Sequence, residues 1–412
     1  MKTLIYNIGV LATPQGTSAN AGEKQGQITF LENAYILCEN GLITQIGTGE
    51  PPAVDAKWID AEGKLVTPGL IDAHTHLVFG GWREHELAMK RRGVPYLEIL
   101  AQGGGILSTV KMTRAASEDE LTQKAHKALK QMLRLGVTTC EAKSGYGLDA
   151  ETERKQLRVI RRLSEEQKVE MVATYLGAHA VPTEYKQNPE RYLSLMEALL
   201  PSLAEEGLAE FCDVFCETGV FDAEQSVRIL SAAKECGLKL KMHADEINAI
   251  GGTEKAAELG AVSVEHLIAA TNEGIDAMAK AGTVAVLLPA TSFYLNKPYA
   301  RARDMIAAGV PVATASDYNP GSCPSLNLQF VMNLACWNYG MSPEEVLTAV
   351  TLNAAAAVCR AERLGSIEVG KQADMVVWNA NNLDYLFYRF GENLVHTVIK
   401  CGEIVHTEGE TK

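Results

Sequence analysis

Beyond residue 65, short apolar runs alternate with longer amphipathic stretches, and this alternation constrains the fold more than any other feature of the chain. One strand followed by one helix, repeated eight times at roughly 30 residues per repeat, is typical of a barrel of ~250 residues. We therefore predict an α/β fold, a TIM (β/α)8 barrel, over residues 65–360. The eight apolar runs that we assign to strands end near His74, Lys143, His179, Cys216, His243, His266, Leu288 and Asp317.

Several of the amphipathic stretches carry a helix start signal. Ser117 is followed three residues later by Glu120, which is a capping box, and the helical pattern after it extends to Leu135. A second capping box with proline at the first helical position begins at Ser342 and predicts a helix to about Cys359. Further helices are predicted over residues 149–165, 188–206 and 223–236.

The two ends of the chain have a different pattern. Residues 1–64 are rich in Gly, Asn and Thr and contain short alternating segments typical of hairpins. Residues 367–378 indicate a turn into a strand, and residues 395–405 indicate a hairpin. Strands at both ends of a barrel predict a small β-sandwich domain assembled from residues 1–64 and 361–412.

Composition excludes some partners. The chain has 412 residues, of which 47% are hydrophobic and 22% charged, as in ordinary globular proteins. A net charge of -13 argues against nucleic acid and anionic membrane surfaces as partners, so an anionic substrate would need a local cation. The chain has no signal-peptide pattern and no apolar stretch of membrane-spanning length, which predicts a cytoplasmic protein.

Five of the eight predicted strands end in His or Asp, although the chain has only nine histidines. The carboxyl ends of barrel strands build the active site. Imidazole nitrogens and a carboxylate suit one Zn²⁺ or iron ion with a position left open for water. A His-x-His pair alone is a weak signal, because two strand histidines often have ordinary packing roles. Its combination with the other strand ends predicts a metal site made of His74, His76, His243 and Asp317.

The motifs of the chain resemble those of the amidohydrolase superfamily. The segments that carry the resemblance are 68–76, 243, 266, 317, 351–355 and 370–374. Narrower segments resemble the ring-opening cyclic-amide hydrolases of that superfamily, and they are 79–86, 103–106, 143–148, 176–182 and 316–322. Relatives with two metals bridge them with a lysine at the end of strand four, where residues 213–217 contain none. The resemblance therefore implies a hydrolase with one metal ion.

The resemblance also implies catalytic roles for three residues. Glu246, three residues after His243, can move a proton from the attacking water to the leaving nitrogen. The alternative is an acidic residue at a helix start, where it meets the helix dipole. His266 can orient the water or bond the carbonyl oxygen, and Asp317 can both ligate the metal and accept a proton.

The substrate that the resemblance implies is 4-imidazolone-5-propanoate, a small anion. Arg83 is the expected bidentate partner of its propionate. Tyr96 and Tyr146 can donate phenolic hydrogen bonds, and His179 can contact the ring or the carboxylate. Without the resemblance, a surface position for Arg83 and ordinary packing of the tyrosines would be favoured. The new carboxylate of the product is expected to contact Asn319, Gly321 and Ser322.

Two alternatives stay open at this point. A nucleobase deaminase shares a single-metal site and a His-x-x-Glu pattern, but has no need of Arg83. A scaffold that kept the fold and lost its chemistry typically loses metal ligands, and all four are present here. The sequence does not decide between zinc and iron, and a homodimer is expected only because it is the commonest assembly of soluble enzymes.

Overall fold

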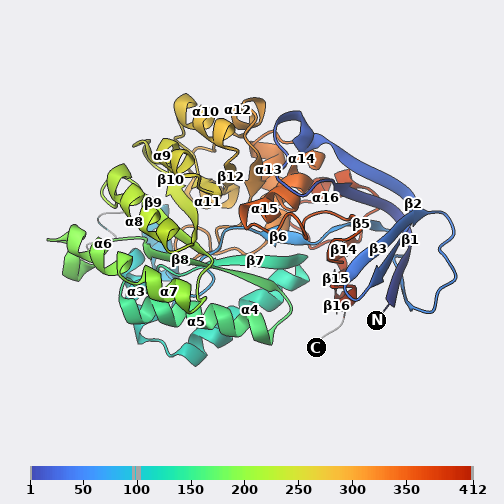
Figure 1. The fold of residues 1–412 in the computed structure, drawn as a ribbon, viewed down its shortest axis with the longest axis horizontal. Helices are drawn as coiled ribbons and strands as arrows, with labels where there is room; N and C mark the ends of the chain where they lie inside the picture. Colours follow the sequence, from blue (N-terminus) through green and yellow to red (C-terminus); the bar gives the residue numbers. More distant parts are fainter. Residues whose placement is uncertain (1, 95–97, 99–103, 410–412) are drawn as a thin grey trace.

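The computed structural model of the chain describes residues 2–94, 98 and 104–409, and these residues form two eight-stranded sheets. One sheet is a parallel barrel surrounded by helices, and the other is a mixed sheet built from both ends of the chain (Figure 1). Within this described part, no helix is both long and apolar enough to cross a bilayer.

The barrel strands follow one another in sequence order, each parallel to the next. Each ends within three residues of the end predicted from the sequence, which confirms the barrel. Their bounds are β6 (Leu70–Asp72), β7 (Val137–Lys143), β8 (Glu170–Ala178), β9 (Phe211–Cys216), β10 (Lys239–Ala244), β11 (Ser263–His266), β12 (Val284–Leu287) and β13 (Val312–Thr314).

The barrel closes between its last and first strands through residues that follow both of them. Thr75 and Tyr318 form an isolated parallel bridge, in which the His76 amide donates to the Tyr318 carbonyl at 2.9 Å. The Asp317 amide likewise donates to the His74 carbonyl at 3.0 Å. The buried Asp72 carboxylate accepts hydrogen bonds from the amide and the hydroxyl of Ser316. The seam of the barrel is therefore held at the segments that carry the predicted metal ligands.

The helices confirm the predicted starts, and two of them are shorter than expected. Capping boxes begin α4 (Glu118–Arg134) at Ser117 and α14 (Pro343–Ala349) at Ser342. The α-helices of the described residues are α1 (Leu87–Arg91), α3 (Ile106–Ala115), α4, α5 (Ala150–Glu166), α6 (Pro189–Glu197), α7 (Leu200–Glu205), α8 (Ala223–Glu235), α9 (Gly252–Leu259), α10 (Asn272–Ala281), α11 (Pro289–Leu295), α12 (Ala302–Ala307), α13 (Leu328–Asn338), α14, α15 (Leu352–Ala357) and α16 (Leu383–Tyr388).

Two predicted helices are each broken in the structure. Residues 188–206 form α6 and α7, and Pro201 explains the break because it lacks an amide hydrogen and its ring clashes with the carbonyl four residues earlier. The helix from Ser342 stops at Ala349 and resumes as α15. Thr351 lies between the two parts, outside helical geometry, and its hydroxyl donates to the Leu347 carbonyl.

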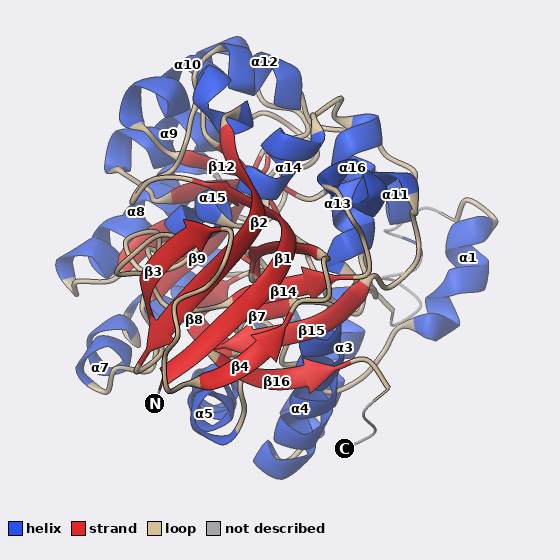
Figure 2. Cartoon of the chain, turned by 90° about the vertical axis from the view of Figure 1, so that its right-hand side faces the viewer, coloured by secondary structure: helices blue, strands red, loops and turns tan. Residues whose placement is uncertain are grey.

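The mixed sheet faces the viewer in Figure 2. Its strands are β1 (Lys2–Pro14), β2 (Ile28–Glu39), β3 (Leu42–Thr48), β4 (Lys57–Asp60), β5 (Leu65–Pro68), β14 (Met375–Trp378), β15 (Val395–Lys400) and β16 (Glu403–Thr407). Strand β5 pairs antiparallel with β14, and this pairing joins the two ends of the chain. Strand β5 then leads directly into β6, the first barrel strand. A separate apolar core that includes Ile5, Ile36 and Met375 packs within this sheet. These observations confirm that strands from both ends of the chain build one separate mixed sheet.

Candidate active site

Four side chains converge at the carboxyl ends of the barrel strands. The His74 and His76 Nε2 atoms lie 3.5 and 3.6 Å from Asp317 Oδ1, and the Nε2 atoms of His76 and His243 lie 3.5 Å apart. Two ligands at ~2.1 Å from a common ion in tetrahedral geometry are about 3.4 Å apart. The structure thus brings together all four residues that the sequence predicts as metal ligands, at the separations that a bound ion requires.

The imidazole rings are held in the form that binds metals. His74 Nδ1 lies 2.8 Å from Glu265 Oε2, and His243 Nδ1 lies 3.0 Å from Asp213 Oδ2. A carboxylate on one ring nitrogen leaves the other nitrogen to the metal. Burial lowers the pKa of His74 and His76 well below the usual value and that of His243 to about 3, so these rings are neutral. The buried His74 Nε2 has no hydrogen-bond partner among the described residues, which fits a metal ligand.

His266 lies beside this group and at the end of its strand, as predicted. It forms a second possible ligand set with His74 and His243, whose ring nitrogens all lie within 4.8 Å of one another. Both His266 and Asp317 adopt left-handed backbone conformations, with φ of 71° and 54°. Such conformations are costly for residues other than glycine and cluster at functional sites.

Glu246 lies in a bend between β10 and α9, and therefore does not begin a helix. Its Oε2 is 3.7 Å from His266 Nε2. Burial, and next the negative charge of Glu217, raise the pKa of Glu246 to about 7. A carboxyl group with this pKa can both accept and donate a proton at neutral pH.

Asp317 divides its two oxygens between the histidines and a hydroxyl. Oδ1 faces His74 and His76, while Oδ2 accepts a hydrogen bond from Thr291. Burial raises the pKa of Asp317 to about 6. The orientation of this carboxylate is therefore fixed by the protein itself.

Two predicted substrate contacts line one side of this centre. The His179 ring stacks on His76 with ring centroids 4.9 Å apart and an interplanar angle of 13°. The Tyr146 ring lies 5.7 Å from His76 and 5.4 Å from His179. His179 Nδ1 is 2.9 Å from the Gly145 carbonyl, and burial lowers its pKa to about 4. His179 therefore presents a neutral ring to this side of the site.

Arg83 approaches the loop that follows Asp317. A side chain on Gly321 would place its Cβ 1.0 Å from Arg83 Nη2, so the guanidinium occupies the space that this glycine leaves. Arg83 Nε is buried and has no hydrogen-bond partner among the residues the structure describes. Lys90 donates to the Gly321 carbonyl at 2.9 Å, which adds a second cation on the same loop.

Asn319 organises the same loop. Its Oδ1 accepts the amides of Gly321 and Ser322 at 2.8 and 2.7 Å, and its Nδ2 donates to Ser322 Oγ at 2.8 Å. The backbone donors predicted to meet the product carboxylate are thus directed to Asn319 in this structure. Tyr96, the remaining predicted contact, lies outside the described residues.

The sequence reasoning missed the charged residues beneath the ligands. Glu141, Lys143, Asp213, Lys241 and Glu265 are all fully buried in barrel strands. The sequence did contain a signal for them. Strands of a parallel barrel are buried on both faces and therefore apolar, and charged side chains are almost never buried unless they are paired. Charged residues inside such runs indicate side chains that support the site.

Fold and site together define a metal-dependent hydrolase built on a barrel. The profile described as amidohydrolase family matches residues 65–405. The imidazolonepropionases of Alkaliphilus metalliredigens (strain QYMF) and Bacillus mycoides (strain KBAB4) are each 52% identical to this chain over 414 aligned residues. These alignments cover 98% and 100% of this chain and 98% of each relative. The chain therefore belongs to the amidohydrolase family, in the branch of the imidazolonepropionases.

Solved structures agree on the fold. A 5-methylcytosine deaminase from Klebsiella pneumoniae superposes with a TM-score of 0.77 at 17% identity, covering 100% of this chain and 99% of the other. A variant of atrazine chlorohydrolase from Arthrobacter aurescens TC1, complexed with zinc and atraton, gives 0.74 at 17% identity, covering 98% and 95%. At this identity the likeness concerns the fold alone.

Proposed function

We propose that this chain opens the ring of 4-imidazolone-5-propanoate by hydrolysing its cyclic amide C–N bond to N-formimidoyl-L-glutamate, a step of histidine degradation. The observation that carries the proposal is the convergence of His74, His76, His243 and Asp317 at 3.5–3.6 Å. The chain that holds them is 52% identical to two imidazolonepropionases over 98% and 100% of its length.

The four converging side chains would hold one zinc or iron ion, since imidazole and carboxylate ligands suit both. When bound, such an ion acidifies water toward a pKa of ~7 and polarises a carbonyl group. The donor atoms of these four side chains, and the distances between them, fit one such ion. The buried carboxylates beside His74 and His243 support one ring orientation for each ligand.

The chain's own residues supply the proton transfer. Glu246 accepts a proton from the attacking water and delivers it to the ring nitrogen that leaves when the C–N bond breaks. His266, whose Nε2 lies 3.7 Å from Glu246 Oε2, orients the water or donates a hydrogen bond to the carbonyl oxygen. Asp317 shares the role of proton acceptor.

We assign substrate orientation to residues outside the proposed ligand set. Arg83 pairs with the propionate through two parallel N–H···O bonds, and Tyr96, Tyr146 and His179 contact the ring and its carboxylate. The new carboxylate of the product is proposed to meet Asn319, Gly321 and Ser322, with the amides of Gly321 and Ser322 turning to it from Asn319 Oδ1, which accepts them in this structure. A chain with a net charge of -13 depends on such local cations to bind an anion.

We further propose one barrel domain over residues 65–360, a small β domain from residues 1–64 and 361–412, and a homodimer as the assembly. The proposed boundary at residue 65 lies at the start of β5, which pairs with β1 and β14 of the mixed sheet and then leads into β6. The dimer rests on the frequency of twofold assemblies among soluble enzymes, and light scattering would test it.

The decisive experiment is incubation of the purified protein with 4-imidazolone-5-propanoate. We expect the ring absorbance to fall, N-formimidoyl-L-glutamate to form, and elemental analysis to find one zinc or iron per chain. His74→Ala and Asp317→Ala should lose metal and turnover together while remaining folded. Full metal content in either variant would remove that residue from the ligand set. Release of ammonia from neutral nucleobases, with no opening of the imidazolone, would favour a deaminase instead.

A further inference from the structure

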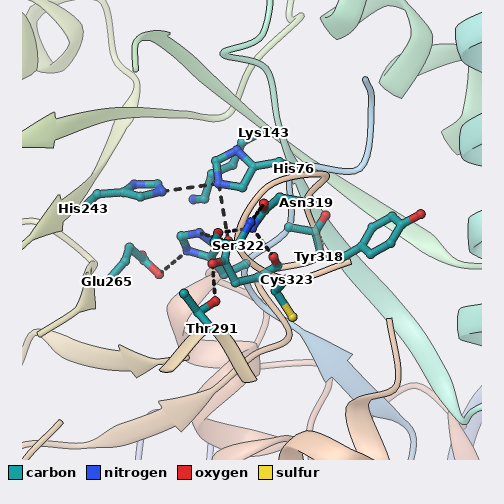
Figure 3. Close-up of polar contacts among 12 residues, drawn as sticks. His76, Lys143, His243, Glu265, Thr291, Tyr318, Asn319, Ser322 and Cys323 are labelled. Carbon is teal, nitrogen blue, oxygen red and sulfur yellow. Dashed lines mark hydrogen bonds and ion pairs between the residues drawn. The ribbon is translucent and has the colours of Figure 1, made fainter. Parts of the chain in front are cut away.

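Lys143, at the end of β7, is a fully buried cation that the proposed reaction does not use. Its Nζ lies 2.8 Å from Glu141 Oε1 and 2.9 Å from Asp213 Oδ2, so one ammonium group joins two buried carboxylates. Figure 3 draws Lys143 together with His76 and His243 at the ends of the barrel strands. A buried charge persists only when it is paired. Each of the two carboxylates also contacts a different part of the proposed ligand set.

The first carboxylate holds the His-x-His segment. Glu141 Oε2 accepts a hydrogen bond from the amide of Thr75 at 3.3 Å, and the Glu141 carbonyl accepts the Thr75 hydroxyl at 2.7 Å. The Lys143 amide donates to the Thr75 carbonyl at 2.9 Å. Thr75 stands between His74 and His76, so these contacts fix the peptide that carries both rings.

The second carboxylate holds the ligand on another strand. Asp213 Oδ1 accepts the backbone amide of His243 at 3.2 Å, and Asp213 Oδ2 lies 3.0 Å from His243 Nδ1. The same Oδ2 contacts Lys143. Asp213 therefore fixes both the backbone and the ring of His243.

We propose that Lys143 is a positioning residue that sets the separation between the His-x-His pair on one strand and His243 on another before any metal binds. Its ammonium group keeps two like charges together that would otherwise repel, and through them it fixes three of the four proposed ligands. The inference rests on the proposed function only in taking these side chains as metal ligands.

The test compares Lys143→Met with a matched control, Lys371→Met. Lys371 is also buried, at 3% exposure, but its ammonium group donates to the carbonyls of Gly16, Ala361 and Leu364 and contacts no ligand. Metal affinity is measured by competition with a chelator. We expect Lys143→Met to bind zinc about 10- to 100-fold more weakly, as for other residues that orient ligands. Lys371→Met should be less stable but should keep the wild-type affinity.

If Lys143→Met bound zinc as tightly as the wild type, or if both variants lost zinc affinity equally, the inference would be overturned. If Lys143→Met does not fold, Lys143→Gln decides on the same criterion, because the amide keeps a donor and removes the charge. Nitrogen NMR of the histidine rings in the metal-free wild type needs no variant, and we expect His243 to be protonated at Nδ1. A ring protonated at Nε2 would also overturn the inference. If the wild type itself binds no metal, it is the proposed function that fails.

Discussion

Glu246 is the residue whose side chain the proposed reaction uses for proton transfer. Glu246→Gln keeps the shape of the side chain and removes its ability to carry a proton. We expect full metal content by elemental analysis and a kcat about 10²- to 10⁴-fold lower. Turnover close to wild type would show that Glu246 does not transfer the proton.

Gly321 is predicted to control substrate affinity through its neighbour. Gly321→Ala would place a methyl group 1.0 Å from Arg83 Nη2, and the guanidinium would have to leave. We expect KM to rise by about one to two decades, as in Arg83→Ala, because a charge-assisted pair is worth roughly 1.5–3 kcal/mol. Arg83→Lys should recover part of the loss, since an ammonium group cannot make the bidentate contact.

The matched control is Gly26→Ala, where the added Cβ meets Glu345 Cγ at 3.4 Å, an ordinary contact distance. It should leave KM unchanged. An unchanged KM in Gly321→Ala and Arg83→Ala would exclude Arg83 as the partner of the propionate.

At the scale of elements, the bend after β10 is held by the end of β9. The Glu217 carboxylate, 2% exposed, accepts the amides of Ile247 and Asn248 at 2.9 and 3.1 Å and the Asn248 side chain at 2.9 Å. These bonds fix the backbone next to Glu246. The charge of Glu217 also raises the pKa of Glu246, after the larger effect of burial.

Glu217→Gln is therefore predicted to change the pH profile as well as the rate. Removal of the negative charge lowers the pKa of Glu246, so its carboxylate form persists to lower pH. The acidic limb of kcat/KM should move to lower pH, and kcat should fall because the bend loses acceptors. The control is Glu258→Gln on α9, whose side chain is 65% exposed and far better solvated. An acidic limb that stays in place would refute the electrostatic part of this prediction.

The sequence predicts elements well where one local signal decides them. The apolar runs located all eight barrel strands, and Ser117 and Ser342 located two helix starts, because strand burial and capping depend on nearby residues. The break at Leu199 was missed although Pro201 signals it, and the break at Thr351 was missed because the helical pattern continues across it. The ligands were predicted because they end strands. Asp213, Glu265 and Glu217 were not predicted, because their roles depend on partners 30 to 191 residues away, as in the 191-residue separation of His74 and Glu265.

At the scale of the whole molecule, Glu170 links the barrel to the C-terminal segment. This first residue of β8 bonds Arg360 at 3.1 Å and Arg363 at 3.0 Å, and it lies 3.8 Å from Lys400. Burial alone would raise the pKa of Glu170. The three cations outweigh this effect and hold the pKa below its usual value. The interaction therefore stabilises the fold at neutral pH.

Glu170→Gln should lower the free energy of unfolding by about 1.5–3 kcal/mol at pH 7, seen as a lower urea midpoint. A carboxyl with a depressed pKa contributes stability above its unfolded pKa of ~4.3, and the contribution is lost as pH falls through the folded pKa. The difference in unfolding free energy between wild type and variant should therefore stay constant above about pH 4.3 and narrow as the pH falls below it. Metal content should not change. A gap independent of pH would contradict the ionic origin.

The seam between β13 and β6 has a consequence for how the protein is made. His74 and His76 leave the ribosome early, whereas Asp317 follows only after more than 200 further residues, and the two segments are hydrogen bonded to each other. Bringing such distant segments into contact costs a large loop-closure entropy, so these contacts form late. A nascent chain that still lacks β13 and Asp317 should therefore be unable to retain its metal, so that stable metal uptake follows the synthesis of this segment.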